Sequence, residues 1–168
     1  TYGPPWHAFN DVWKSQNGID WVLVTEEAEW SGRYAFGYGT FKGNIFLMGG
    51  RNQAEEPLND IWMSKDGTTW TKIIENAPWE ERSFDQLLIT NNLMFIVGGT
   101  GSKDTIYKDI WYSENGIKWC KLQDNAPYPQ RFGSLNYLEE NGDTIRIWKI
   151  GGVTDIPDPD NPKINLHF

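Results

Sequence analysis

The sequence predicts an all-β chain made of repeated four-stranded antiparallel units, and three observations carry that prediction. Helix-forming residues never recur at the three- and four-residue spacing of an amphipathic helix for more than one turn. Short runs of β-branched and aromatic residues are instead separated by clusters of Gly, Asn, Asp and Pro, as strands are by turns. Ten Trp and 17 Gly among 168 residues depart strongly from average usage, which is typical of a repeated motif.

Several kinds of residue recur along the chain with a spacing of 49 residues. The recurring types are two Trp, one further aromatic residue and one Arg. A pair of glycines steps by 49 and then by 53, because the stretch 139–143 lengthens one turn, and an insertion in a turn leaves the strands intact. The sets are Trp13, Trp62 and Trp111; Trp21, Trp70 and Trp119; Trp30, Trp79 and Tyr128; Arg33, Arg82 and Arg131; and Gly49 with Gly50, Gly98 with Gly99, Gly151 with Gly152.

Each repeat is interpreted as four strands. Residues 34–41 lead through a turn into 45–48, which ends at the double glycine, and residues 59–64 turn at an Asp-Gly pair into 70–74. Asn-Gly and Asp-Gly pairs allow positive φ at both central positions of a type I′ turn, so we expect two-residue hairpin tips there. Burying one Trp removes about 150–250 Å² from water, roughly 4–6 kcal/mol. We therefore assign the two repeated Trp sets and the glycine pairs structural roles.

Four-stranded units with a double glycine, a later Trp and a leading Arg resemble kelch repeats, each of which forms one blade of a β-propeller. The chain is similar to a Trp-rich variant, because the strand after the glycines contains Asn-Asp-Ile-Trp where a Tyr-containing strand is commoner. The hairpin Ser64 to Trp70 also resembles the Asp-box of sialidase-type propellers, one residue short between Asp and Gly. That box is structural, so it supports a propeller and not glycosidase chemistry.

The resemblance implies one kelch-type propeller segment over residues 1–168, with about three blade equivalents and a ring that this chain alone does not close. Residues 1–24 would be the third and fourth strands of a blade, 33–74 and 82–123 whole blades, and 131–168 the first two or three strands of another. Two explanations stay open. The chain is an excerpt of a longer polypeptide, as its start without Met suggests, or two copies complete a six-bladed ring.

In kelch blades two sets of loops emerge at one end, around the mouth of the central channel, where ligands usually bind. Acids outnumber bases in these loops, and we expect them to bind a basic peptide or protein, with Trp30, Trp79 and Tyr128 as aromatic anchors. The alternative is that the acids only solvate the loops while the aromatic residues pack between blades. The charged loop residues are Glu26, Glu27, Glu29, Arg51, Glu55, Glu56, Glu75, Glu80, Glu81, Lys103, Asp104, Asp124, Asp155, Asp158 and Asp160.

The repeated arginines give a second hypothesis. Arg33, Arg82 and Arg131 begin the innermost strands, and the resemblance implies that their guanidinium groups converge on the channel mouth, where some kelch proteins bind acidic ligands. Arg51, directly after Gly50, is a further candidate. The alternative is that each Arg binds backbone carbonyls or a repeated aspartate; the two aspartates are Asp60 and Asp109.

An enzyme is the alternative function. Kelch relatives include a copper oxidase, which needs Tyr, Cys and His together, and a sugar mutarotase that uses Arg and Glu in the channel. His7 and His167 have no metal-site spacing, and Cys120 occupies the repeat position of Val22 and Thr71. We therefore expect no metal, cofactor or catalytic residue, and keep a carbohydrate-binding or sugar-processing propeller as the alternative. Residues 155–162 alternate acids but lack the Gly and terminal Glu of a calcium loop, which favours a Pro-stiffened exposed loop.

Charge and composition limit the partners. A formal net charge of −8 argues against binding to nucleic acid or to an anionic membrane surface. The single cysteine excludes an intrachain disulfide, and no apolar stretch is long enough to span a bilayer. We expect a soluble, non-catalytic interaction or structural module, with a secreted or cell-surface location favoured over the cytoplasm.

Overall fold

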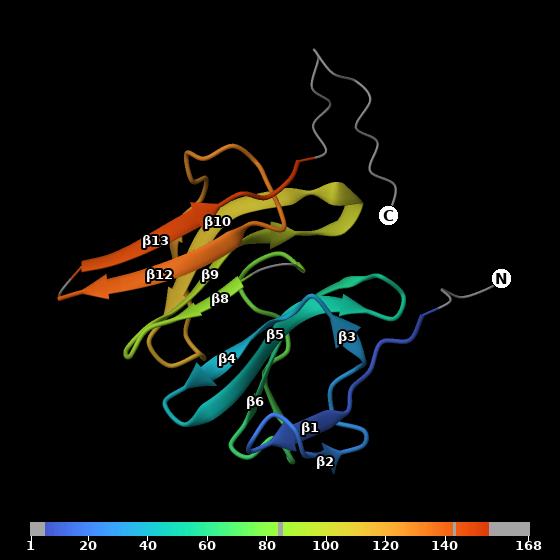
Figure 1. Ribbon diagram of the computed structural model, residues 1–168. Helices are drawn as coiled ribbons and strands as arrows, with labels where there is room; N and C mark the ends of the chain where they lie inside the picture. Colours follow the sequence, from blue (N-terminus) through green and yellow to red (C-terminus); the bar gives the residue numbers. More distant parts are fainter. Residues whose placement is uncertain (1–5, 84–85, 143, 155–168) are drawn as a thin grey trace.

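The computed structural model describes residues 6–83, 86–142 and 144–154, which form a row of antiparallel β-sheets (Figure 1). The first sheet pairs β1 (Val12–Ser15) with β2 (Trp21–Thr25), and the second contains β3 (Arg33–Tyr34), β4 (Gly37–Phe41), β5 (Asn44–Asn52), β6 (Pro57–Ser64) and β7 (Thr71–Ile74). The third contains β8 (Gln86–Ile89), β9 (Met94–Thr100), β10 (Ile106–Ser113) and β11 (Cys120–Gln123), and the fourth pairs β12 (Leu135–Asn141) with β13 (Thr144–Ile150). The predicted all-β class is confirmed, with one 3-10 turn, Ser102–Asp104, as the only helical element of the described residues.

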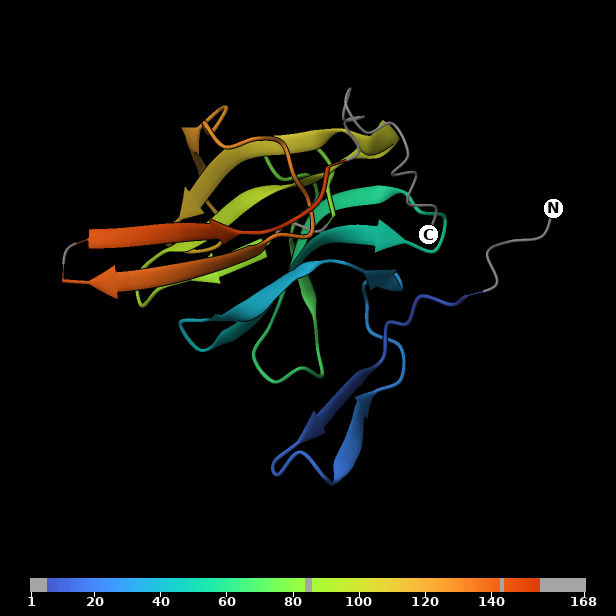
Figure 2. The ribbon, with the colours of Figure 1, turned by 45° about the horizontal axis from the view of Figure 1, so that its top comes forward.

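The two middle sheets share one strand order. In the third sheet β8, β9, β10 and β11 are neighbours in sequence order. In the second, β3 and β4 both pair with β5 and together act as one first strand that is interrupted at Ala35, whose φ is 52°. Contacts between sheets join first strands, β4 to β8 and β8 to β12, so successive sheets fan out from a common edge (Figure 2). The described sheets do not close into a barrel.

The hairpin tips are of two kinds. Lys42 and Gly43 join β4 to β5 with φ of 48° and 76°, the paired positive values of a type I′ turn. The tip between β6 and β7 is longer, and the prediction of a two-residue turn at Asp66 and Gly67 is wrong, because only Gly67 has positive φ.

Side chains fold this longer tip instead of a tight backbone turn. The Ser64 hydroxyl accepts hydrogen bonds from the Asp66 and Gly67 N–H groups, at 3.3 and 2.9 Å. Asp66 Oδ1 accepts from the N–H groups of Thr68 and Thr69, at 2.8 and 3.3 Å. Trp70 Nε1 then donates to the Gly67 carbonyl at 3.1 Å, which seats the indole under the loop. Short polar side chains that bind nearby backbone thus replace the turn that the Asp-Gly pair predicts.

The core lies between the sheets and is rich in Trp. One cluster joins the second and third sheets and includes Phe46, Ile61, Met94 and Ile96, all of which are at most 2% exposed. A second cluster joins the first and second sheets through Trp30, Leu47, Trp62 and Trp70. Because interlocked aromatic side chains bury more area than any other residue type, these clusters fix how each sheet sits on the next.

The double glycine adopts a conformation that other residues avoid, but it does not end the strand as the sequence predicted, because β5 continues past Gly50 to Asn52. Gly50 has φ of 92°, and a Cβ added there would lie 2.7 Å from the Tyr34 carbonyl oxygen and 2.9 Å from the Phe36 Cβ. Gly152 repeats this geometry against the Phe132 carbonyl oxygen, at 2.9 Å. The glycine is therefore required both by the backbone angle and by the close approach of the first strand.

Candidate functional site

Two of the repeated arginines form buried ion pairs: Arg33 with an aspartate of its own sheet, and Arg82, whose backbone bonds to Leu58 of β6, with an aspartate of the third sheet. Arg33 Nη1 lies 2.6 Å from Asp60 Oδ1 and Nη2 lies 3.0 Å from Oδ2, while Nη1 also donates to the Gly49 carbonyl at 2.9 Å. Arg82 repeats the arrangement with Asp109, at 2.6 and 3.0 Å, and with the Gly98 carbonyl, at 3.0 Å. Both guanidinium groups are buried. Their donors are thus satisfied within the fold and are not presented to a ligand.

The carboxylate of Asp60 shows the electrostatic effect of this arrangement. Burial alone would raise its pKa, but the hydrogen bonds and charge of Arg33 and a hydrogen bond from Trp62 Nε1 outweigh burial and hold the pKa below the ordinary value of 3.8. The group is therefore ionised at neutral pH, and the ion pair is a permanent part of the sheet.

The other two arginines differ from this pair. Arg131 is half-buried; its Nε donates to the Pro129 carbonyl at 3.3 Å and its Nη1 to the Gly151 carbonyl at 3.1 Å. It forms no ion pair with any carboxylate of residues 6–154 that the structure describes.

Arg51 joins the second and third sheets. It donates to Ser83 Oγ at 3.0 Å and to the Gly101 carbonyl at 2.8 Å, and also to the backbone of its own loop at Glu55. Its donors therefore hold two loops together at the end of the sheets.

The repeated aromatic residues proposed as anchors lie beneath the loops. Trp30 is 6% exposed and packs edge-on against Trp70, with ring centroids 5.9 Å apart. Trp79 is 5% exposed and packs against Trp119 in the same way, at 4.9 Å. Tyr128 is half-buried, with the Lys149 ammonium 5.0 Å from its ring centroid. Trp30 and Trp79 thus have the packing role that the sequence left open as an alternative.

The six structural Trp do not share one environment. Trp62, Trp70, Trp111 and Trp119 are buried between sheets. Trp13 and Trp21, at the same positions of the first sheet, are 50% and 59% exposed. The buried indoles of Trp70 and Trp119 are each covered by a further Trp, Trp30 and Trp79 respectively.

The loop end of the sheets displays carboxylates. Most of the loop acids predicted to form this surface are exposed, and only Glu75 and Asp124 form ion pairs among the described residues, with Lys72 and Lys121. The exposed acids are Glu26, Glu27, Glu29, Glu55, Glu56, Glu75, Glu80, Glu81 and Asp124. Since Arg33, Arg51 and Arg82 direct their donors into the protein, the net exposed charge at this end is negative.

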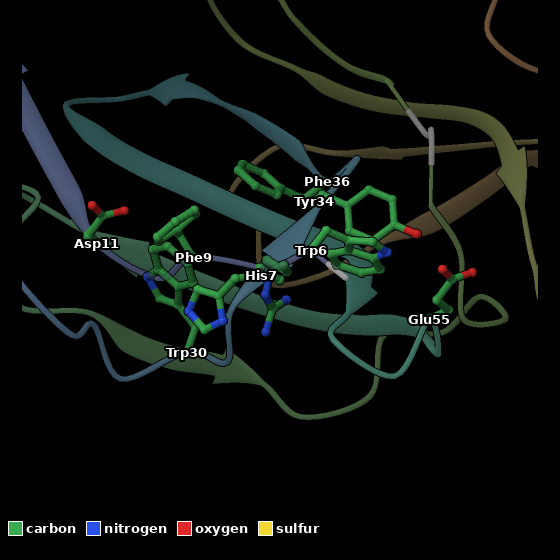
Figure 3. A pocket seen from close by; sticks show the side chains of 10 residues that line it. Trp6, His7, Phe9, Asp11, Trp30, Tyr34, Phe36 and Glu55 are labelled. Atoms are coloured by element: carbon green, nitrogen blue, oxygen red, sulfur yellow. The ribbon is translucent and has the colours of Figure 1, made fainter. Parts of the chain in front are cut away.

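A cavity of about 510 Å³ opens beside the first sheet, and the repeat pattern did not predict it (Figure 3). Trp6, Phe9, Tyr34 and Phe36 line it with aromatic surface, and Asp11 and Glu55 supply carboxylates. Trp6 packs edge-on against Tyr34, with centroids 5.2 Å apart. The repeat partners of Trp6 and Phe9 are Glu55 and Leu58, so the 49-residue register contains no signal for this aromatic lining.

Part of the predicted surface falls outside the described residues. Asp155, Asp158, Asp160 and His167 lie there, as does the proposed third strand of the last unit, and no structure is described for the side chain of Asp104. Within the described residues no three His, Cys, Asp or Glu side chains gather as a metal site would require. Cys120 is a free, exposed thiol in β11.

No protein-family model matches this chain, and no curated protein matches it. The part of the chain that the structure describes holds no helix with the length and apolar character needed to cross a bilayer.

Proposed function

We propose that the chain is a kelch-like β-propeller segment that acts as a non-catalytic interaction module and binds a basic protein or peptide at its acidic loop end. Three features support the propeller type. The two middle sheets repeat one strand order, their first strands lie side by side, and a double glycine with positive φ lies within each second strand. Each feature is what radially repeated four-stranded sheets require.

The observation that carries the binding proposal is the unequal use of charge at the loop end. Three arginines there donate to carbonyls, hydroxyls or aspartates of the protein itself, while the neighbouring glutamates face solvent. A surface with exposed negative charge and internally satisfied positive charge attracts cationic partners and raises their association rate. Glu80 and Glu81, which are adjacent and exposed, lie in the loop that leads from β7 to the third sheet.

Fluorescence anisotropy with a labelled oligolysine peptide tests this proposal. Binding is expected at low salt and should weaken steeply as salt rises. The double variant Glu80→Lys with Glu81→Lys should lose about tenfold in affinity. The matched control is Glu114→Lys with Glu140→Lys, which makes the same change in net charge at the opposite tips of the sheets. Equal loss in both variants, or no binding of the peptide at low salt, would contradict a site at the loop end.

A carbohydrate-binding or sugar-processing propeller is the second candidate, and the cavity beside the first sheet favours it. Aromatic walls with two carboxylates, such as Asp11 and Glu55, can stack on a sugar ring and accept its hydroxyl hydrogens. NMR measurement of anomer exchange, with Trp fluorescence during titration of monosaccharides, distinguishes this function from the first. Accelerated exchange that Glu55→Gln abolishes would favour the sugar function.

A further inference from the structure

Three repeated arginines make the same hydrogen bonds to backbone carbonyls, but within the described residues only two of them also form an ion pair with an aspartate. Arg33 and Arg82 each donate from Nε to the carbonyl two residues earlier and from Nη1 to the first glycine of the double glycine. Arg131 makes the same two bonds, to the Pro129 and Gly151 carbonyls. It is thus held in the pose of the other two arginines, and the bond that it lacks among the described residues is the one to a carboxylate.

The complementary half lies at the other end of the chain. In both complete pairs the aspartate also accepts a hydrogen bond from the Trp two residues later, at 2.7 Å for Asp60 and 2.8 Å for Asp109. Asp11 accepts the same bond from Trp13 Nε1, at 2.7 Å. Its carboxylate is oriented as in the complete pairs, lines the cavity beside the first sheet, and contacts no Arg among the described residues.

The two incomplete halves cannot meet within one copy. Arg131 precedes β12, and Asp11 precedes β1; in both Figures 1 and 2 the β1–β2 and β12–β13 hairpins lie apart, with strands of the second sheet between them. We propose that a second copy of this chain joins them, so that Arg131 of each copy pairs with Asp11 of the other. Two copies then form one closed ring through two equivalent interfaces.

The strand edges agree with this assembly. The strands β6 and β10 are paired on both sides, by β5 and β7 and by β9 and β11. Among the residues that the structure describes, their counterpart β1 pairs only with β2, and β13, the counterpart of β5 and β9, pairs only with β12. Transfer of the β5–β6 and β9–β10 registers places Ile150 opposite Val12 and Ile147 opposite Ser15. Such pairing removes two exposed strand edges in each copy, which otherwise favour aggregation.

The apolar surfaces at the two ends are also complementary. Trp13, Trp21 and Leu23 are exposed on the first hairpin, as are Trp148 and Ile150 on the last. Elsewhere in the chain the aromatic residue that precedes each unit covers the second Trp of that unit, as Trp30 covers Trp70. Tyr128 precedes the last unit in the same register, so in the assembly it would cover Trp21 of the second copy.

This proposal concerns the ends of the row of sheets and does not depend on the partner of the acidic loop end. Its first test is the mass of the full chain in solution, measured in about 0.15 M salt, where repulsion between two acidic chains is largely screened. The expected mass is twice the 19.4 kDa of one chain. Burial of Trp13 and Trp21 should also shift Trp fluorescence to shorter wavelength as the concentration rises.

Charge exchange gives the decisive test. Arg131→Asp and Asp11→Arg, each alone, should give monomers, because each interface would then place two groups of the same charge opposite each other. An equimolar mixture of the two variants should recover the dimer, since one interface regains the natural pair and the other a reversed pair. The matched controls, Lys65→Asp and Glu114→Arg, carry the same charge changes in exposed hairpin tips and should stay dimeric.

A monomeric natural chain overturns the proposal, and so does a dimer that both charge reversals leave intact. The acids of the chain's own residues 155–160 are the competing partner for Arg131. A triple variant with Asn in place of Asp155, Asp158 and Asp160 tests this alternative. If the chain is a monomer, and the triple variant lowers the free energy of unfolding as much as Arg131→Asp does, then Arg131 is paired within its own chain and the proposal fails.

Discussion

Arg33 and Asp60 are separated by 27 residues, yet two hydrogen bonds of 2.6 and 3.0 Å join the guanidinium to the carboxylate between the first and third strands of one sheet. The Arg33 side chain is 1% exposed. A bidentate pair of this kind fixes the relative position of two strands that do not pair with each other, since its planar fork accepts only one geometry.

Loss of one partner of such a pair should be costly. In Asp109→Asn the isosteric amide leaves the buried charge of Arg82 without a counterion, and the free energy of unfolding should fall by about 3–5 kcal/mol. Urea denaturation measures the change. The control, Asp124→Asn, removes the exposed Lys121–Asp124 pair and should leave the midpoint of urea denaturation unchanged. Similar losses of stability in both variants would show that the buried Arg82–Asp109 pair contributes no more to stability than an exposed pair.

The ion pair also predicts how stability depends on pH. The pKa of Asp60 is lower in the folded chain than its ordinary 3.8, so the unfolded chain binds a proton first as pH falls. The stabilisation is complete above about pH 5, well above the unfolded pKa, and should be lost as pH drops through the folded pKa. Urea midpoints of the natural chain and of Asp60→Asn, measured from pH 7 down to pH 3, should converge on the acid side. A constant difference between the two would contradict the shift.

The repeated Trp offer a matched pair for measuring packing. Trp62→Ala should lower the free energy of unfolding by about 3–5 kcal/mol, because it empties a buried site between two sheets. Trp13→Ala changes the same repeat position where the side chain is half exposed. At a dilution at which the chain is monomeric, thermal denaturation should show a much smaller shift for Trp13→Ala; equal shifts would mean that register and not burial decides the cost.

Two glycines separate backbone strain from steric clash. Gly43 and Gly50 both have positive φ, but a Cβ at Gly43 would meet no atom within 4 Å, whereas at Gly50 it would approach backbone at 2.7 Å. Gly43→Ala should cost about 1–2 kcal/mol from backbone strain alone. Gly50→Ala should cost about 1–3 kcal/mol more, because the first strand has to move. Equal costs in denaturant unfolding would show that the approach of the first strand relaxes freely.

The sequence allowed the strands of each unit to be predicted because turn residues and a fixed period mark them. The glycine pairs, the hairpin at Lys42 and Gly43, and the burial of Trp62 and Trp70 follow from residue type and spacing. What spacing could not supply was three-dimensional partnership. Residue type predicts a tight turn at Asp66, but residue type alone does not fix the backbone angles of an Asp. The conformation of this loop depends on Ser64, whose hydroxyl accepts hydrogen bonds from two backbone N–H groups.

The candidate sites were harder to predict for the same reason. A repeated Arg in a sequence is equally consistent with a residue that binds an external ligand and with one half of an internal ion pair. Only the positions of Asp60 and Asp109 in the structure distinguish the two roles. The aromatic cavity uses Trp6 and Phe9, which stand outside the 49-residue pattern, so no periodic signal could reveal it. Trp13 is exposed whereas Trp62, at the same repeat position, is buried, so the exposure is a property of packing and not of the residue type.

The loop from Ser64 to Trp70 closes through bonds between residues no more than three positions apart. Such contacts cost little chain entropy, so this hairpin can form before distant strands have met. The loop that begins at Ser113 closes in the same way, through Asn115, Gly116 and Trp119. Folding of this chain therefore has more than one starting point, and structure can spread from either hairpin to its neighbours.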